Sequence, residues 1–272
     1  MSARSVRVTA LGSGDALGGG GRHASSWLVR DALGAVLVDA GPGVLQGLHR
    51  AGVDPHPPQG REGINAVHFT HLHGDHIAGW PFFLLDAIHR AHRAAPLAVT
   101  GPPGTRERLQ TLWSACYPDT AQRPLGFALT CYELLPGDRL EVAGRGLEAL
   151  RAQHQRPPHV ALSLRLASSG GVLAFTGDTG PHHGLAALAA GARALFSECT
   201  GLEAEPGLPE SEKKHLSWGE LRARLPALGV RDVVLSHLGK APRGARARIE
   251  AEGKALGHEV TVCDDGTTVH LD

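Results

Sequence analysis

The sequence is poor in several features that mark particular classes of protein. Aromatic residues make up only 4% of the 272 residues, which argues against a surface of stacked rings for single-stranded nucleic acid. The 27 basic and 27 acidic residues cancel, so net charge does not favour a polyanion-binding protein, although a local basic patch stays open. The four cysteines form no C-x-x-C pair, and a chain of this length needs no disulfide framework.

Long apolar runs are also absent. Residues 1–14 contain no extended hydrophobic stretch, and no run of about 18 apolar residues occurs anywhere in the chain. We therefore expect no secretion signal and no membrane span. The predicted location is the cytoplasm, with the cysteines as free thiols. A homodimer is left open, because nothing in the sequence tests it.

The sequence that remains has the composition of a globular protein, with 42% hydrophobic and 20% charged residues. Short Val- and Leu-rich runs mix with Ala- and Arg-rich helical stretches in both halves, the second series starting near Leu147. This pattern predicts two β-sheets packed together with helices outside, and one domain over residues 1–272. The expected strands are Val6–Leu11, Ser26–Val29, Ala35–Val38, Ala66–Thr70, Leu97–Thr100, Ala128–Tyr132, Leu147–Ala152, Ala161–Leu166, Val172–Phe175, Ala194–Ser197, Asp232–Leu235, Val260–Cys263 and Thr268–Leu271.

Helices are expected in six places. One start is well marked, because Ser217 followed by Glu220 fits a capping box ahead of Leu221 and Leu225. The Pro/Gly-rich segments 52–63 and 201–214 are expected to be surface loops, the second long enough to form a flap. The expected helices are Gly43–Ala51, Pro81–Arg93, Thr105–Trp113, Leu185–Ala190, Gly219–Leu228 and Gly244–Leu256.

Residues 70–76, Thr-His-Leu-His-Gly-Asp-His, concentrate metal-binding side chains in one short segment. Imidazole nitrogens and carboxylate oxygens are the ligands of zinc and similar divalent ions. His71 and His73 point the same way if the segment stays extended, and Gly74 would let the chain turn sharply before Asp75 and His76. Four donors in two pairs indicate two metal ions rather than one.

Three more candidate ligands follow apolar runs later in the chain. His154 follows residues 147–153, Asp178 follows residues 172–177, and His237 follows residues 232–236. Polar residues at strand ends meet at one edge of a sheet, where loops commonly carry binding and catalytic groups. An aspartate there can bridge two cations with its two oxygens.

These motifs, in this order, resemble the metallo-β-lactamase fold superfamily of hydrolases. The resemblance implies an α/β (α+β) protein, an αββα four-layer sandwich of two mixed β-sheets packed face to face with helices outside. It also implies an enzyme with two Zn²⁺ ions, although Mn²⁺ or Fe²⁺ could bind the same ligands. One metal ion would take His71, His73 and His154. The other would take Asp75, His76 and His237, with Asp178 bridging the pair and Asp75 also acting in catalysis.

Further segments resemble the ribonuclease Z branch and its phosphodiesterase relatives. They include residues 11–29, the stretch after His154, and Phe-Ser-Glu-Cys-Thr at 196–200 followed by His-Leu-Ser-Trp at 215–218. In that branch the corresponding Glu198 and His215 form a dyad that assists the leaving group. Asp39 matches the aspartate of the family's D-x-G tripeptide, which orients ligand imidazoles.

The resemblance leaves the substrate open. We favour a small or cyclic phosphodiester, because a metal-activated hydroxide and a histidine acid suit a leaving alkoxide. Ribonuclease Z activity on precursor tRNA is the first alternative, but many such enzymes carry a tRNA-binding arm between the third histidine and the bridging aspartate. Here that gap is 178 − 154 = 24 positions, too short for an arm, so nucleic acid is possible and not favoured.

The sequence also allows other reaction classes and other metal ligands. A lactone, thioester or sulfate-ester hydrolase remains an alternative reaction class, and a non-enzymatic metal-binding module is disfavoured because all the ligand types are present. His159 competes with His154 as a ligand, and His182 or His183 could crowd the site beside Asp178. Class II cyclic-nucleotide phosphodiesterases resemble the chain at residues 177–181 and at residues 215–217 ahead of Leu221, but their signature has Leu in place of Gly74.

Overall fold

Two seven-stranded sheets form the centre of the molecule. The computed structural model describes residues 5–56, 63–239 and 242–271. In spatial order, the first sheet contains β14 (Thr268–Leu271), β1 (Val6–Gly12), β2 (Ser26–Asp31), β3 (Gly34–Val38), β4 (Ile64–His68), β5 (Leu97–Gly101) and β6 (Leu129–Glu133). The second contains β13 (Glu259–Val262), β12 (Asp232–Ser236), β11 (Ala194–Glu198), β10 (Gly171–Phe175), β9 (Leu162–Ser168), β8 (Arg145–Arg151) and β7 (Arg139–Val142).

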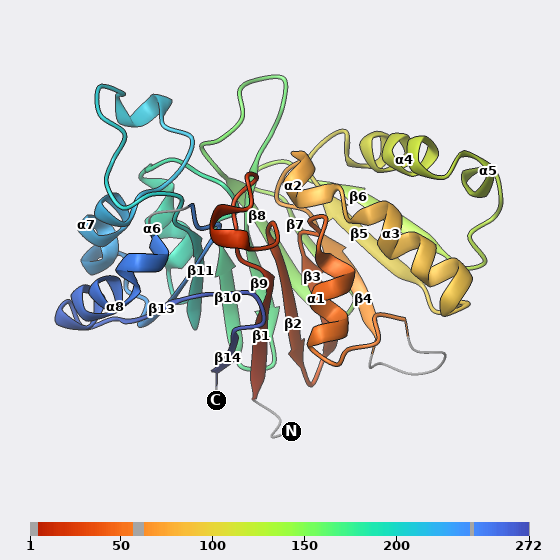
Figure 1. The fold of residues 1–272 in the computed structure, drawn as a ribbon, viewed down its shortest axis with the longest axis horizontal. Helices are drawn as coiled ribbons and strands as arrows, with labels where there is room; N and C mark the ends of the chain where they lie inside the picture. The colour runs from red at the N-terminus through yellow and green to blue at the C-terminus, as the bar shows by residue number, and fades with distance from the viewer. Residues whose placement is uncertain (1–4, 57–62, 240–241, 272) are drawn as a thin grey trace.

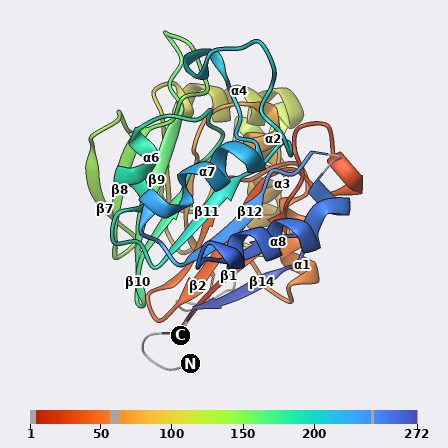
Figure 2. The same cartoon turned by 90° about the vertical axis from the view of Figure 1, so that its left-hand side faces the viewer.

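Helices cover the outer face of each sheet (Figures 1 and 2). The first sheet carries α1 (Val44–Arg50), α2 (Gly74–Ile77), α3 (Trp80–Leu85), the π-helix η2 (Asp86–Arg90), α4 (Thr105–Cys116) and α5 (Pro118–Ala121). The second carries α6 (Gly184–Ala189), α7 (Trp218–Leu228) and α8 (Arg246–Ala255). Short 3₁₀ turns complete the elements: η1 (Gly19–Gly21), η3 (Glu210–Glu212) and η4 (Pro242–Ala245). This is the expected four-layer αββα sandwich.

Alternating side chains on the strands produce the layers. On β2, Trp27 and Val29 pack between the sheets, whereas Leu28 faces the helices outside the first sheet. Leu195 on β11 likewise packs outward with helix residues, whereas Phe196 lies between the sheets. Central strands buried on both faces contain consecutive apolar residues, which explains the Val- and Leu-rich runs of the sequence.

The strand and helix predictions are largely correct, with three kinds of error. Strand β7 was not predicted, because its polar, exposed residues at a sheet edge give a weak alternation signal. The helix expected over Pro81–Arg93 divides into α3 and the π-helix η2, and His92 then adopts a left-handed φ of 47°. The short helices α2 and α5 were also missed, and Phe69 and Thr70 lie beyond the end of β4.

The helix cap, the cysteines and the loops expected from the sequence have these counterparts in the structure. The capping box at Ser217 and Glu220 is present at the start of α7. The four cysteines are free. The expected loop over residues 201–214 contains the 3₁₀ turn η3, and part of the expected loop over 52–63 lies outside the described residues. Within the described ranges, no helix is long and apolar enough to cross a membrane.

Several strands end at the same edge of the sandwich. Strands β3 and β4 are parallel, as are β10, β11 and β12, and β8 runs with them because it is antiparallel to β9, which is antiparallel to β10. Within each sheet the loops that follow these parallel strands therefore leave from one edge. The two edges adjoin, because His237 Nε2, after β12, lies 3.4 Å from Asp75 Oδ2, after β4. These loops carry the polar residues singled out by the sequence.

Candidate metal centre

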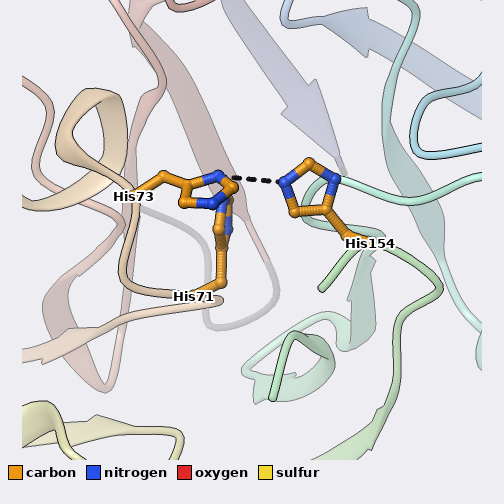
Figure 3. A group of neighbouring side chains, drawn as sticks. All are labelled: His71, His73 and His154. Atoms are coloured by element: carbon orange, nitrogen blue, oxygen red, sulfur yellow. Dashed lines mark hydrogen bonds between the residues drawn. The ribbon is translucent and has the colours of Figure 1, made fainter. Parts of the chain in front are cut away.

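The side chains predicted as metal ligands lie in two adjoining clusters at this edge. In the first, the ligand atoms of His71, His73 and His154 lie within 4.8 Å of one another. Figure 3 shows the three rings pointing toward one another, His71 and His73 from the β4–α2 loop and His154 from the loop after β8. His154 Nε2 is 3.0 Å from His73 Nδ1. The second cluster contains Asp75, His76, Asp178 and His237.

Asp178 lies between the two clusters. Its Oδ1 is 3.3 Å from His76 Nε2, and its Oδ2 is 3.2 Å from His237 Nε2. The same Oδ2 is 3.8 Å from His71 Nε2 and 3.9 Å from His154 Nε2. Asp75 contacts only the second cluster, with its Oδ2 3.3 Å from His76 Nε2 and 3.4 Å from His237 Nε2. The arrangement therefore has the form of two ligand sets joined by one carboxylate.

The backbone is unusual where two of these loops begin. Asp39 directly follows β3 with a φ of 59°, and His237 directly follows β12 with a φ of 52°. Non-glycine residues rarely adopt this left-handed region, and such strain concentrates at functional sites. Gly74, where the sequence led us to expect a turn, begins helix α2 directly after the extended His73.

Glu198 and His215 form a pair beside the clusters. Both carboxylate oxygens of Glu198 lie 3.1 Å from His215 Nδ1. The His215 ring stacks on the ring of His237 with centroids 5.3 Å apart and an angle of 10°. Glu198 is buried, whereas the His215 side chain is 35% exposed. A carboxylate thus orients an accessible imidazole next to the second cluster.

The competing histidines lie elsewhere. His159 is exposed and takes no part in the ligand clusters found among the described residues. His182 and His183 precede α6 and line a neighbouring pocket rather than the clusters. The choice of His154 over His159 therefore agrees with the geometry.

Comparison with known proteins identifies the family. A model described as the β-lactamase superfamily domain matches residues 35–238. The chain is also 32% identical over 246 residues to a protein named Ribonuclease Z from Mycobacterium bovis (strain BCG / Pasteur 1173P2), with 85% of each chain covered. The chain belongs to the metallo-β-lactamase superfamily. It is accordingly a hydrolase whose fold serves divalent-metal chemistry.

Solved structures of the superfamily share the whole fold. The metallo-β-lactamase fold protein YhfI from Bacillus subtilis superposes with a TM-score of 0.76 at 20% identity, covering 98% of this chain and 99% of that one. The short form of human tRNase Z superposes with a TM-score of 0.72 at 21% identity and the same coverage. At these identities the superpositions establish the fold alone.

The buried atoms of the clusters fit the superfamily's metal ions. The Nε2 atoms of His71 and His76 are buried and have no hydrogen-bond partner, although buried polar atoms are normally paired. Burial, assisted by neighbouring imidazoles, lowers the pKa of His71 well below its ordinary value. Burial likewise lowers the pKa of His154 to about 4. Neutral imidazoles with free lone pairs are the form that binds a divalent metal ion, and His71 and His154 have that form. For His76 and His237 burial opposes the charged ring, but the nearby Asp178 outweighs burial and raises each pKa, so a metal ion would displace a proton there.

The pKa values of Asp178 and His215 are shifted toward their charged forms. Burial alone would raise the pKa of Asp178, but the nearby His237 and His76 outweigh it and hold that pKa well below its usual range. For His215, burial opposes the charged form, but the carboxylate of Glu198 outweighs burial and raises the pKa to about 9. The pair can therefore hold a proton at neutral pH beside the ligand clusters.

Hydrogen bonds outside the clusters hold the imidazoles in place, and two of the participants were missed from the sequence. Thr70 donates its amide and hydroxyl hydrogens to Asp39, at 2.8 Å each. Thr200 donates its hydroxyl hydrogen to Glu198 at 2.8 Å, and this hydroxyl lies 3.1 Å from His237 Nδ1. Position within the quoted motifs was the only signal for either threonine, because a lone threonine has no distinctive spacing.

Proposed function

We propose that the chain is a phosphodiesterase whose two ligand clusters hold two divalent metal ions, Zn²⁺ in the first instance. His71, His73 and His154 would bind one ion, Asp75, His76 and His237 the other, and Asp178 would bridge them. The observation that carries the proposal is the Glu198–His215 pair beside this set. A leaving alkoxide needs a proton, and an imidazole held by a carboxylate can supply one.

Bound metal ions supply two things at such a site: they lower the pKa of a water molecule and they withdraw charge from a phosphoryl oxygen. The protein's own groups do the rest. Asp39 accepts a hydrogen bond from His76 Nδ1 at 2.7 Å and so orients its ring. Asp178 and Asp75 would balance positive charge, and His215 would donate its Nε2 proton to the departing oxygen. Glu198 contacts His215 Nδ1 and stabilises the charged form of the ring. Asp75, in the second cluster, would act on the same substrate group.

Two substrate classes are consistent with this chemistry. A small or cyclic phosphodiester is favoured, because the segment between His154 and Asp178 is too short to contain a tRNA-binding arm. An RNA strand is the second candidate, and it is supported by the relative named Ribonuclease Z, which matches 85% of the length of both chains.

The test combines metal analysis with a substrate screen. Protein purified without chelators should contain close to two zinc ions per chain and hydrolyse bis-p-nitrophenyl phosphate. Cyclic nucleotides, precursor tRNA, a lactone and a thioester are then compared on the same preparation. Hydrolysis of the lactone or thioester with no turnover of any phosphodiester would refute the proposal, and protein that takes up no metal would refute it independently.

A further inference from the structure

A second pocket, of about 350 Å³, adjoins the candidate metal centre. Its walls come from the loop between β8 and β9, the residues just before α6, and the segment around η3. In Figure 1 the β8–β9 loop and the η3 segment stand at the same edge of the molecule. Three cationic side chains, Arg151, Arg156 and Lys214, line this pocket with a single carboxylate, Glu212. Positive charge is thus concentrated here in a chain whose formal net charge is zero.

These three cations differ from their neighbours in having no carboxylate partner. Lys213 pairs with Glu220 at 2.6 Å, and Arg224 pairs with Glu210 at 2.6 Å. Among the described residues, Arg151, Arg156 and Lys214 take part in no ion pair of this kind. The two arginines are exposed, and Lys214 is half-buried. Their charges are therefore available to an anionic ligand.

The pocket is held at a set position relative to the metal centre. His154 lies between pocket residues Gln153 and Gln155, and its Nδ1 donates to the Lys214 carbonyl oxygen at 2.9 Å. The Gln153 carbonyl oxygen accepts from the Gly180 amide at 2.8 Å, and its side chain donates to the Lys213 carbonyl oxygen at 3.2 Å. The same residues thus join the pocket wall to the first ligand cluster.

We infer that this pocket binds a second phosphate of the substrate. The inference rests on the proposed phosphodiesterase activity and narrows its substrate class. Guanidinium groups bind phosphate oxygens through paired hydrogen bonds, and an ammonium adds a point charge. A cyclic mononucleotide has one phosphate, which the metal centre would take, leaving the pocket without a ligand. Within the small phosphodiesters proposed above, the preferred substrate is therefore one with a further phosphate beside the one that is cleaved, as in a short oligonucleotide, and not a cyclic mononucleotide.

Three diuridine compounds provide the test: UpU, which has only its internal phosphodiester, and the 5′- and 3′-phosphorylated forms pUpU and UpUp. We expect metal-replete protein to have a KM for pUpU or UpUp about tenfold below that for UpU. The double variant Arg151→Gln/Arg156→Gln should reduce this ratio to about twofold and leave kcat on UpU unchanged. Arg108→Gln is the control: it removes an exposed charge from α4, which covers the first sheet, and should preserve the ratio.

Binding measured without turnover separates this inference from the proposed function. On chelator-treated protein, calorimetry should show tighter binding of a phosphorylated dinucleotide than of UpU, by a margin that shrinks with added salt and is lost in the double variant. Equal binding of all three compounds would overturn the inference, as would a double variant that weakens UpU equally. Preserved discrimination in binding, with no hydrolysis by metal-replete protein, would refute the phosphodiesterase proposal and leave the phosphate pocket standing.

Discussion

Asp39 Oδ2 accepts a hydrogen bond of 2.7 Å from Nδ1 of His76, and both side chains are almost fully buried. This contact orients the His76 ring so that its Nε2 faces Asp75 and Asp178. Burial opposes the charged ring, but Asp178 and Asp39 outweigh burial and raise the pKa of His76 well above its ordinary value, so a metal ion bound at Nε2 would displace a proton. Asp39 also accepts from the amide and hydroxyl of Thr70, next to His71. One carboxylate therefore organises the start of the ligand-bearing loop.

We expect Asp39→Ala to weaken zinc binding by about 10–100-fold, because the His76 ring loses the acceptor that orients it. Competition against a chromophoric zinc chelator measures the change. Asp119→Ala, on the exposed helix α5, is the matched control and should bind zinc as the wild type does. Equal affinities for the wild type and Asp39→Ala would show that other contacts orient His76.

Asp178→Ala should remove both metal content and activity. Among the described residues, Asp178 has the one carboxylate within 4.0 Å of histidines from both clusters. We expect turnover of bis-p-nitrophenyl phosphate to fall by at least about a hundredfold, and elemental analysis to find less metal per chain. A variant that retained full metal content and turnover would rule out the bridging role.

His215→Ala should lower turnover by about 10²–10⁴ while leaving the metal content intact. The reason is that both predicted ligand sets are complete without His215, although its ring nitrogens also lie within 4.8 Å of ligand atoms of His154, Asp178 and His237. The loss should be larger for a dinucleotide than for a p-nitrophenyl ester, since p-nitrophenolate departs with little help from an acid. Unchanged kcat on the dinucleotide would contradict the proton-donor role.

The ion pair between Arg145 and Asp31 should matter for stability and not for metal binding. Both side chains are fully buried, and Arg145 Nη1 lies 2.8 Å from Asp31 Oδ2. The pair joins the start of β8 to the end of β2, and so links the two sheets at the edge opposite the metal centre. Arg145→Met leaves a buried carboxylate unpaired and should cost about 3–5 kcal/mol in urea unfolding. A loss below about 1 kcal/mol would contradict this expectation.

His56 should make stability depend on pH. Its Nε2 lies 3.1 Å from the Phe83 carbonyl oxygen, and its Nδ1 lies 3.0 Å from Arg93 Nη1, contacts that suit a neutral ring. Burial, reinforced by the Arg93 charge, lowers its pKa to about 4. Between about pH 6.5 and pH 4, His56 therefore binds a proton in the unfolded chain but not in the folded chain. The free energy of unfolding falls as the pH drops through this range, by up to about 3 kcal/mol.

Comparison with His56→Gln isolates this contribution. The difference in unfolding free energy between the wild type and the variant should shift against the wild type as pH falls from 6.5 to 4. Urea titrations of metal-free protein at several pH values measure it. A difference that stays constant over this range would show that His56 does not titrate as the contacts imply.

Patterns over a few residues predict most of the strands, the cap of α7 and the candidate ligands at strand ends. The strand ends carrying Asp178 and His237 follow buried apolar runs, and the capping box at Ser217 is encoded within four residues. The π-helix η2 and the edge strand β7 were missed, because their formation depends on packing rather than on local periodicity. The pairing of Glu198 with His215 depended on the resemblance, since the two are 17 positions apart and neither has a distinctive spacing.

The sequence by itself determined which residues could serve as ligands, because imidazole and carboxylate chemistry belongs to the side chain and the motif holds four of them in seven positions. Only the tertiary structure decided which of the later histidines joins them, and that Asp178 lies between the two clusters. It also brought together Arg151, Arg156 and Lys214, which no local pattern connects. Such groupings arise when strands from both sheets end at one edge, and the packing of the sheets sets that arrangement.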